Sequence, residues 1–310
     1  MENKHQSYDL AQMQSLPLSA KIIMTEQRIK QWYDAFDGEV YVSVSGGKDS
    51  QVLAHIVKNL YPDVPCVFVN TGLEYDSVRL KGIELSDEVL IPEMNFVQVV
   101  TKYGYPIISK SVSHIVEIAK NNPDGKVANR YFSNEMNGSR FDCKRYEWLL
   151  DAPFRVSDKC CNIMKKKSGA KYQKRTGRKI ILGTMADESQ LRRKNWIKYG
   201  CNAFETKHPS SQPLSFWTEE DIWQYIKYYG LEIAEAYKTE SRTGCVFCMF
   251  GITQDKDRFL RLKELEPKKY DFVMRGGKFD ESGMWIPHNG LGYKFVIDWL
   301  NEHGGLNIRY

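Results

Sequence analysis

The stretch YVSVSGGKDSQVL, residues 41–53, sharply narrows the folds open to this chain. Residues 40–44 alternate β-branched valines with other side chains, a pattern typical of a β-strand. Two glycines follow, and apolar residues then recur with helical spacing from Val52 onward. Asp49 or Ser50 is expected to cap this helix. The sequence therefore predicts a strand, a glycine turn and a helix in direct succession.

A turn of this kind suits a bound anion. The start of a helix presents unpaired N–H groups and the positive end of its dipole, and glycines let the backbone approach a phosphate closely. Lys48 adds a positive charge, and Asp49 is suited to hold Mg²⁺ beside phosphate oxygens. The plain alternative is a tight turn with an exposed lysine. The expected phosphate-binding residues are Ser45, Gly46, Gly47, Lys48, Asp49 and Ser50.

Strand and helix patterns alternate along much of the chain. Further strands are expected in the run VPCVFVNTG, residues 64–72, and at 95–100 and 179–184, and helices at 111–120 and 218–229. Thr218 caps the last helix and Gly230 ends it. This alternation predicts an α/β fold, a parallel sheet with helices on both faces.

Ligands of such sheets bind at the carboxyl ends of the strands. The segment NTG, which contains Thr71 and Gly72, lies at one such end. The segment GTMADES, which contains Gly183 and Asp187, lies at another. We expect both segments to meet the SGGKDS turn around one nucleotide.

The SGGKDS turn resembles the PP-loop of ATP pyrophosphatases, which cleave ATP between its α- and β-phosphates. Its spacing fits neither a Walker A loop nor a dinucleotide-binding fingerprint. The resemblance implies an adenine nucleotide alpha hydrolase-like, Rossmann-like fold. It also implies ATP as ligand, Mg²⁺ as cofactor, and Lys48 and Asp49 as catalytic residues.

Four of the seven cysteines form two close pairs, Cys160 with Cys161 and Cys245 with Cys248. Residue 157 or 158 is expected to cap a helix whose first turn carries the vicinal pair, where the helix dipole favours thiolates. Four thiolates can hold zinc or an iron–sulfur cluster. Both kinds of metal site stay open on spacing alone.

The cysteine pattern CC…CxxC on a PP-loop fold resembles adenylylsulfate reductases and other members of the phosphoadenylylsulfate (PAPS) reductase family. PLSFWTEEDIWQYI and GTMADESQLRR are similar to two further motifs of that family, so the resemblance covers roughly residues 25–255. It implies a [4Fe–4S] cluster on the four paired cysteines. It also implies that Arg192 or Arg193 binds an anion.

The tail, NEHGGLNIRY, departs from this family. Reductases of the family carry a nucleophilic cysteine in a tail like E-C-G-[IL]-H, whereas no cysteine follows Cys248 here. Sulfonucleotide reduction would then need Cys143, Cys201 or a cysteine of a partner protein, although both residues are expected to be structural, as is Cys66 in its strand. The tail could still close over the site, with His303 near the ligand.

Two basic stretches raise the question of nucleic acid. Residues 165–179 hold eight Lys or Arg around Tyr172, and residues 191–200 add basic residues with Trp196 and Tyr199. Such stretches can grip a polyanion and stack its bases. A solvated helix face with aromatics in the core is an equally good interpretation.

We expect an N-terminal helical lead at 1–30, a nucleotide-binding domain at 31–235 and a segment at 236–310 that folds back on the site. No apolar run approaches 18 residues and no signal peptide is recognisable, so a cytoplasmic protein without membrane contact is expected.

The resulting hypothesis is a [4Fe–4S] PP-loop enzyme that cleaves ATP to AMP and pyrophosphate in sulfur metabolism or thio-modification. The alternatives are a sulfonucleotide reductase and a non-catalytic nucleotide- or nucleic-acid-binding protein. An adenine nucleotide is the expected ligand, and a sulfur-donor protein and a nucleic acid are the open candidates for partners.

Overall fold

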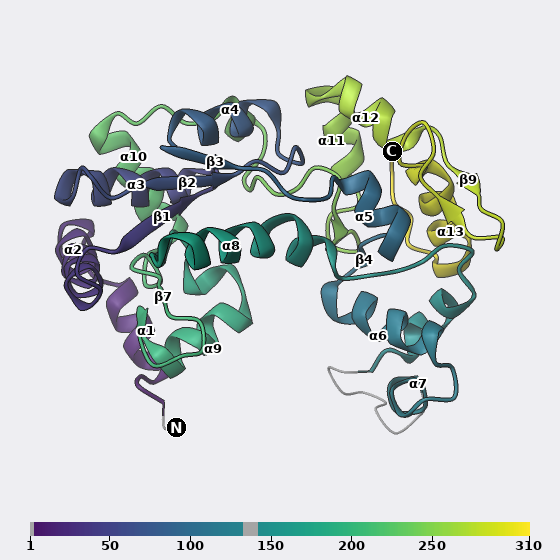
Figure 1. The fold of residues 1–310 in the computed structure, drawn as a ribbon, viewed down its shortest axis with the longest axis horizontal. Coiled ribbons are helices and arrows are strands. Elements are labelled where there is room, and N and C mark those ends of the chain that lie inside the picture. The colour runs from purple at the N-terminus through teal and green to yellow at the C-terminus, as the bar shows by residue number, and fades with distance from the viewer. Residues whose placement is uncertain (1–2, 133–141) are drawn as a thin grey trace. The chain divides into compact units, whose positions relative to one another are not determined.

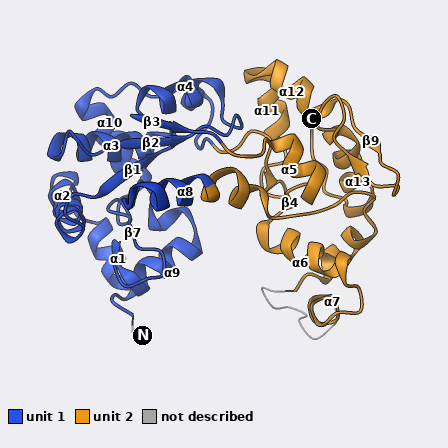
Figure 2. Cartoon of the chain, in the orientation of Figure 1, with its two compact units in different colours: residues 1–91, 168–243 blue, residues 92–167, 244–310 orange. Residues whose placement is uncertain are grey.

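A computed structural model describes residues 3–132 and 142–310 of the chain (Figure 1). Two compact units divide the chain, each built from two separate segments (Figure 2). Unit 1 comprises residues 1–91 and 168–243, and unit 2 comprises residues 92–167 and 244–310.

This division differs from the linear one expected from the sequence. Residues 92–167, which the sequence assigned to the nucleotide-binding domain, belong with the C-terminal residues 244–310. Residues 236–243 belong instead to unit 1. Local patterns reveal elements but not which distant elements share a core, and this explains the difference.

Unit 1 contains a six-stranded sheet of order β3-β2-β1-β5-β7-β6, parallel except for the pairing of β6 with β7. The chain moves from β1 outward through β2 to β3 and returns on the other side of β1 as β5, so the order reverses beside β1. The strands are β1 Val40–Val44, β2 Cys66–Val69, β3 Glu88–Leu90, β5 Lys179–Leu182, β6 Asn202–Ala203 and β7 Ser210–Ser211. The α/β class predicted from the sequence is confirmed.

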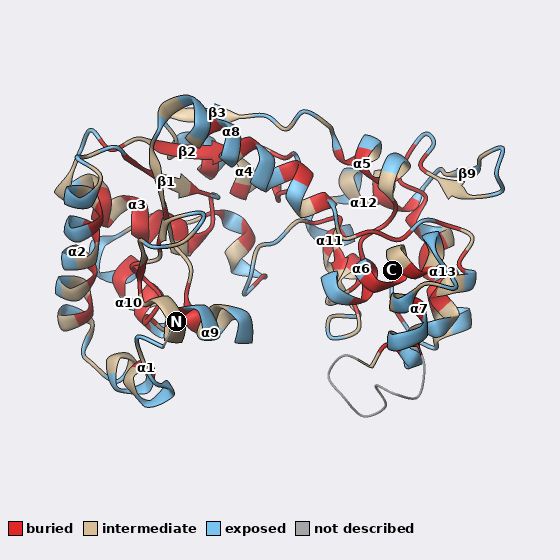
Figure 3. Cartoon of the chain, turned by 60° about the horizontal axis from the view of Figure 1, so that its bottom comes forward, coloured by how far each residue is buried: buried red, intermediate tan, exposed pale blue. Residues whose placement is uncertain are grey.

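Period-two alternation on β1 separates the two faces of this sheet. Val40, Val42 and Val44 pack into the main core with helices α2, α3 and α10, whereas Tyr41 packs on the opposite face against Tyr172 of α8. Buried residues line the strands and the inner sides of these helices (Figure 3). The helices of unit 1 are α1 Ser7–Gln14, α2 Leu18–Ala35, α3 Lys48–Leu60, α4 Asp76–Glu84, α8 Lys167–Thr176, α9 Gln190–Tyr199 and α10 Glu219–Tyr229, with 3₁₀ turns η4 Ala186–Glu188 and η5 Glu235–Lys238.

Unit 2 is mostly helical around an aromatic core. Tyr105 packs edge-on against Phe154 and Tyr293, and Trp299 packs edge-on against Phe154. Its elements are α5 Phe96–Tyr103, β4 Ile107–Ile108, α6 Lys110–Asn121, α7 Lys126–Tyr131, the 3₁₀ helix η2 Lys144–Asp151, the π-helix η3 Asn162–Lys166, β8 Met249–Phe250, α11 Arg258–Leu265, α12 Pro267–Met274, β9 Lys278–Phe279, β10 Trp285–Ile286 and α13 Tyr293–Gly304. The short strands β4 and β8 pair in parallel, and β9 and β10 form a hairpin.

The strand predicted at residues 95–100 is wrong, because these residues begin helix α5. Asn95 accepts a hydrogen bond from the backbone of Gln98, and the Gln98 side chain accepts one from the Asn95 backbone. This capping box fixes a helix start, and the buried residues Phe96, Val99 and Val100 then share one helical face. The third strand of the sheet is β3 instead.

The other expected elements are confirmed with small changes of length. β5 ends at Leu182, two residues before the predicted end, and α10 has its predicted cap at Thr218 and its predicted stop at Gly230. None of the helices within the described ranges is both long and apolar enough to cross a lipid bilayer.

Candidate functional site

The SGGKDS turn joins β1 to α3, and glycine is required at its centre. Gly46 has φ +74°, and a Cβ there would lie 1.9 Å from the backbone oxygen of Val78 in α4. Gly47 is the N-cap of α3, so the helix begins at Lys48 and neither Asp49 nor Ser50 caps it as predicted. Ser50 Oγ instead accepts from the Ser45 N–H at 3.1 Å and donates to the Gly47 carbonyl at 2.9 Å. These two bonds close the turn.

Lys48 is buried, with 3% of its surface exposed, which excludes the alternative of a solvent-exposed turn lysine. Its Nζ lies 3.3 Å from Glu219 Oε1 and 3.4 Å from the Ser241 carbonyl oxygen. The rings of Tyr237 and Trp223 lie 5.3 and 5.8 Å from the same nitrogen. The positive charge is therefore held inside the turn by groups that the sequence did not mark.

Asp49 is the half-buried acid of the turn. Burial raises the pKa of its carboxyl, Lys48 opposes that shift, and the nearby Glu188 and Glu219 reinforce it. Its Oδ1 makes no hydrogen bond within the described residues, and Lys48 Nζ lies 3.6 Å away. A buried carboxylate oxygen without a hydrogen bond is a suitable donor for Mg²⁺, which takes one or two carboxylates beside phosphate. The turn therefore fits the cation that its resemblance implies.

A tyrosine covers the first amide of α3. The Lys48 N–H donates to Tyr237 Oη at 3.0 Å, and Tyr237 Oη lies 2.8 Å from Thr243 Oγ1. Tyr237 comes from the 3₁₀ turn η5, and burial raises the pKa of its phenol. An amide of this kind is where a phosphate oxygen would bind at a helix start. Tyr237 and Thr243 are thus site residues that the sequence analysis missed, since no local pattern marks them.

Two predicted segments follow strands of the sheet: Thr71 and Gly72 follow β2, and Gly183 follows β5. Gly183 lies against the turn, since a Cβ there would be 2.8 Å from the Asp49 carbonyl oxygen. Thr71 is buried and donates to Glu74 Oε1 at 2.6 Å, which makes its hydroxyl part of a local turn with Gly72. The parallel pairing of β1 with β2 puts Thr71 at the same edge of the sheet as the SGGKDS turn.

Asp187 and Arg192, which follow β5, are bonded to residues outside the SGGKDS turn. Asp187 accepts a hydrogen bond at 2.8 Å from Gln14 of α1, and Arg192 forms an ion pair with Glu188. Arg193 is half-buried on α9. Glu188 thereby links the arginine segment to the carboxyl of Asp49, whose pKa it raises.

The four paired cysteines lie together in unit 2. Cys160 and Cys161 occupy the first turn of a helix, as predicted, and the Ser157 hydroxyl accepts from the Lys159 N–H before it. Cys245 and Cys248 bound a tight turn closed by the Cys248 N–H and the Cys245 carbonyl. A hydrogen bond with Cys161 and burial raise the pKa of Cys160, and the charges of Cys248 and Cys245 add to this shift, so the two pairs share one electrostatic environment.

The surroundings of Cys161 favour its thiolate, whereas burial raises the pKa of Cys248 to about 11. A hydrogen bond from the Cys160 thiol lowers the pKa of Cys161 to about 5, and the charges of Lys110 and Lys165 contribute. The Phe250 N–H donates to Cys248 Sγ at 3.4 Å. Within residues 3–132 and 142–310, no three His, Cys, Asp or Glu side chains converge as ligands of a single ion. Four cysteine sulfurs are a donor set of the kind that holds zinc or an iron–sulfur cluster.

The remaining cysteines and the tail offer no reactive group. Cys66, Cys143 and Cys201 are buried, and burial raises the pKa of each thiol, to about 11 for Cys66 and Cys201. His303 belongs to the last turn of α13 and stacks on Trp299 at 4.4 Å. His303 thus packs on Trp299 of its own helix, and closure of the tail over the site stays a prediction.

The basic stretches contribute aromatic side chains to the core instead of to the surface. Tyr172 is 4% exposed and packs on Tyr41, and Trp196 is buried in a stack with His5. Neither ring is free to stack a base. The expectation of nucleic-acid binding through residues 165–179 loses its aromatic component, while the charges remain.

Comparison with known proteins places the chain in a family. The sequence pattern of the Phosphoadenosine phosphosulfate reductase domain matches residues 39–89 and 83–250. An uncharacterized protein of Methanocaldococcus jannaschii is 25% identical over 275 residues, 83% of this chain, and the chain spans about half, 54%, of its length. The adenosine 5'-phosphosulfate reductase of Staphylococcus epidermidis is 22% identical over 243 residues, 74% of this chain and 78% of that enzyme.

Among solved structures, the phosphoadenylyl-sulfate (PAPS) reductase from Candida auris matches 69% of this chain and 83% of its own, with a TM-score of 0.40 and 12% identity. The family pattern covers both the SGGKDS turn and the two cysteine pairs. The chain therefore belongs to the phosphoadenosine phosphosulfate reductase domain family.

Proposed function

We propose that this protein is a PP-loop ATP pyrophosphatase of its family that carries a [4Fe–4S] cluster and forms AMP and pyrophosphate. The observation that supports it most is the intact turn, with a buried lysine and a buried aspartate oxygen that lacks a hydrogen bond. Lys48 and the amides of the turn would hold the β- and γ-phosphates, and Asp49 would hold Mg²⁺.

In this reaction an oxygen of the acceptor attacks the α-phosphorus, and the bond from that phosphorus to the bridging oxygen of the β-phosphate breaks. Pyrophosphate leaves with the bonding electron pair, and the acceptor proton passes to solvent or a base. The acceptor oxygen is then joined to AMP, which leaves when a second nucleophile displaces it; where water is the acceptor, AMP forms directly. Lys48 stabilises the charge on the leaving group because its ammonium is already desolvated inside the turn. A cluster on Cys160, Cys161, Cys245 and Cys248 would supply redox-active iron.

The second candidate, sulfonucleotide reduction, has the support of the relationship to adenosine 5'-phosphosulfate reductase. It needs a thiolate that attacks sulfur. Cys143 and Cys201 are buried with raised pKa values, so neither is a suitable nucleophile. Sulfonucleotide reduction would then need a cysteine of a partner protein, whereas ATP cleavage needs no thiol.

The test is the product of ATP turnover by anaerobic protein with Mg²⁺. We expect AMP and pyrophosphate, and binding of ATP weakened about tenfold or more by Lys48→Ala, since a charge-assisted contact is worth about 1.5–3 kcal/mol. Lys58→Ala, which removes an exposed lysine of the same helix, is the matched control. Formation of ADP, or equal ATP binding by the Lys48 variant, would contradict the proposal. Catalytic sulfite release from adenylylsulfate would establish the reductase instead.

A further inference from the structure

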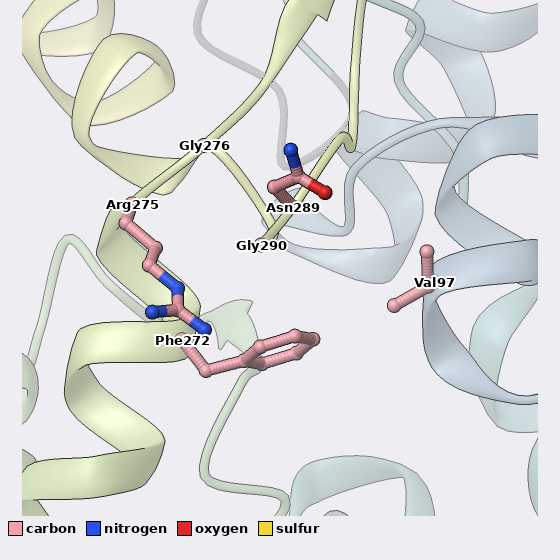
Figure 4. A pocket seen from close by; sticks show the side chains of 6 residues that line it. All are labelled: Val97, Phe272, Arg275, Gly276, Asn289 and Gly290. Carbon is pink, nitrogen blue, oxygen red and sulfur yellow. The ribbon is translucent and has the colours of Figure 1, made fainter.

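Unit 2 contains a cavity of about 640 Å³, a volume typical of small-ligand sites. Figure 4 shows the ring of Phe272 pointing from α12 into this space, with Val97 of α5 across from it. Its lining residues are Val97, Phe272, Arg275, Gly276, Asn289 and Gly290.

The wall of the cavity is held in shape by backbone hydrogen bonds. The Leu291 N–H donates to the Phe272 carbonyl at 3.0 Å, and the Gly292 N–H donates to the Arg275 carbonyl at 2.8 Å. A Cβ at Gly290 would lie 2.3 Å from the Arg275 carbonyl oxygen, so the two segments approach as closely as glycine allows. The cavity is therefore a preformed feature of this unit.

Its polar groups suit a nucleotide. The Arg275 guanidinium lies beside the Phe272 side chain, and Asn289 lies next to Gly290 on the neighbouring segment (Figure 4). An aromatic face stacks a base, an asparagine amide can pair with a base edge, and arginine binds phosphate. Arg275 is paired with Asp271 at 3.1 Å, but both side chains are about 60% exposed, so the pair is weak enough for a phosphate to compete.

The chain next to the cavity adds a further positive charge and a further exposed aromatic ring. Lys278 and Phe279 follow two residues after Gly276, on β9, and the ring of Phe279 is 52% exposed. One side of that ring packs edge-on against Trp285 and Phe295, which holds it in place. An exposed, supported ring beside a lysine is a second stacking position along a phosphate backbone.

Charge also distinguishes this unit. Residues 92–167 and 244–310 contain 23 Lys or Arg and 17 Asp or Glu, whereas residues 1–91 and 168–243 contain 21 and 22. The whole positive excess of the chain thus lies in unit 2. A polyanionic partner is favoured there by the field of the unit as well as by local contacts.

We propose that this cavity binds an unpaired nucleotide of a single-stranded nucleic acid, with Phe272 stacking the base and Arg275 contacting its phosphate. As a binding site it is independent of the proposed ATP cleavage. Only the assignment of the bound nucleic acid as the acceptor that attacks ATP rests on that function.

The test measures binding of full-length protein, without ATP, to a fluorescent 12-nucleotide RNA, the same sequence as DNA, a duplex of it, AMP and an aspartate-rich peptide. We expect either single strand to bind more tightly than the duplex. Phe272→Leu should weaken that binding about tenfold, because base stacking on an aromatic ring is lost. Arg275→Gln should lower the slope of log affinity against log salt by about one.

Two further variants separate a specific contact from net charge. Asp271→Asn frees Arg275 and should tighten binding. Arg309→Gln, which breaks another exposed arginine–aspartate pair of unit 2, should leave binding unchanged. Unaltered binding by the Phe272 and Arg275 variants would overturn the proposal, as would equal affinity for AMP alone or tighter binding of the peptide. If Phe272→Leu fails to fold, the Arg275 and Asp271 variants decide. Failure of ATP cleavage would not affect any of these results.

Discussion

The two units hold their candidate sites by different means. In unit 1 the SGGKDS turn is shaped mainly by the backbone: a parallel strand, a glycine with positive φ and the start of a helix form it together. In unit 2 the turns that carry the cysteines are fixed by side-chain hydrogen bonds. Glu117 accepts from both Ser157 and Lys159, and Arg258 donates to the Cys248 carbonyl. We infer that the first site depends on backbone geometry and the second on a set of side-chain contacts.

The largest effect is expected in unit 2. Cys245→Ser should abolish the binding of about four irons and four sulfides per anaerobic chain, because a Cys₄ cluster loses a ligand. ATP binding in unit 1 should persist. Metal and sulfide analysis with ATP titration measures both. Cys143→Ser, at a buried cysteine of the same unit, is the control and should keep its iron. Stoichiometric zinc in oxygen-free protein would count against the cluster.

In unit 1, Gly46→Ala should lower the free energy of unfolding. A left-handed non-glycine residue costs about 1–2 kcal/mol, and the overlap with the Val78 carbonyl adds about 1–3 kcal/mol. Gly72→Ala is a matched control, since Gly72 has φ +71° but no atom lies within 4 Å of the place that a Cβ would take there. Chemical denaturation should give a clearly larger loss of unfolding free energy for Gly46→Ala. Equal losses would show that the close approach to α4 is unimportant.

A smaller effect is expected at Tyr237. Its hydroxyl accepts the Lys48 N–H that a phosphate would use. Tyr237→Phe removes this competing acceptor, and a net hydrogen bond is worth about 1 kcal/mol, so ATP should bind about fivefold more tightly. Isothermal titration with ATP and Mg²⁺ measures the change. Weaker binding would instead mean that the hydroxyl contacts the nucleotide.

The smallest effect concerns one buried and one half-buried lysine. Lys21 of unit 1 is paired with Asp221 at 2.6 Å, whereas Lys120 of unit 2 donates to the carbonyls of Ala152 and Phe154. Burial lowers the pKa of Lys120 to about 8 from 10.5. Between these values the unfolded chain binds more protons than the folded one, so this lysine makes stability rise with pH from about 8 to 10.5.

Comparing wild type with Lys120→Met across that pH range isolates the contribution, because all other titrating groups are shared. We expect the variant to lose part of the upward slope. Identical slopes would show that Lys120 keeps an ordinary pKa in the folded protein.

Sequence patterns were sufficient where structure is local. The alternating valines of β1, the turn after it and the cap of α10 at Thr218 all lie where their patterns indicate. The apolar run at 95–100 misled because it suits either a strand or a buried helix face, and the capping box at Asn95 decided in favour of a helix.

Long-range contacts were beyond the reach of these patterns. Nothing near Glu219 or Tyr237 in the sequence shows that both touch Lys48. The basic run around Tyr172 suggested a surface for nucleic acid, yet its ring fills the second face of the sheet. The two cysteine pairs could be grouped from the sequence because both motifs carry thiols. That inference does not depend on the structure of the residues between them.

The pairing of β1 with β5 also has a consequence for synthesis. Val40 lies opposite Lys179, and the first segment of unit 2, residues 92–167, is made between them. Until residue 182 leaves the ribosome, β1 has one open edge, and its alternate valines lack part of their core. Contacts this distant in sequence form slowly, and open strand edges invite association with other chains. The SGGKDS turn is thus made early, but its strand is among the last to gain both neighbours.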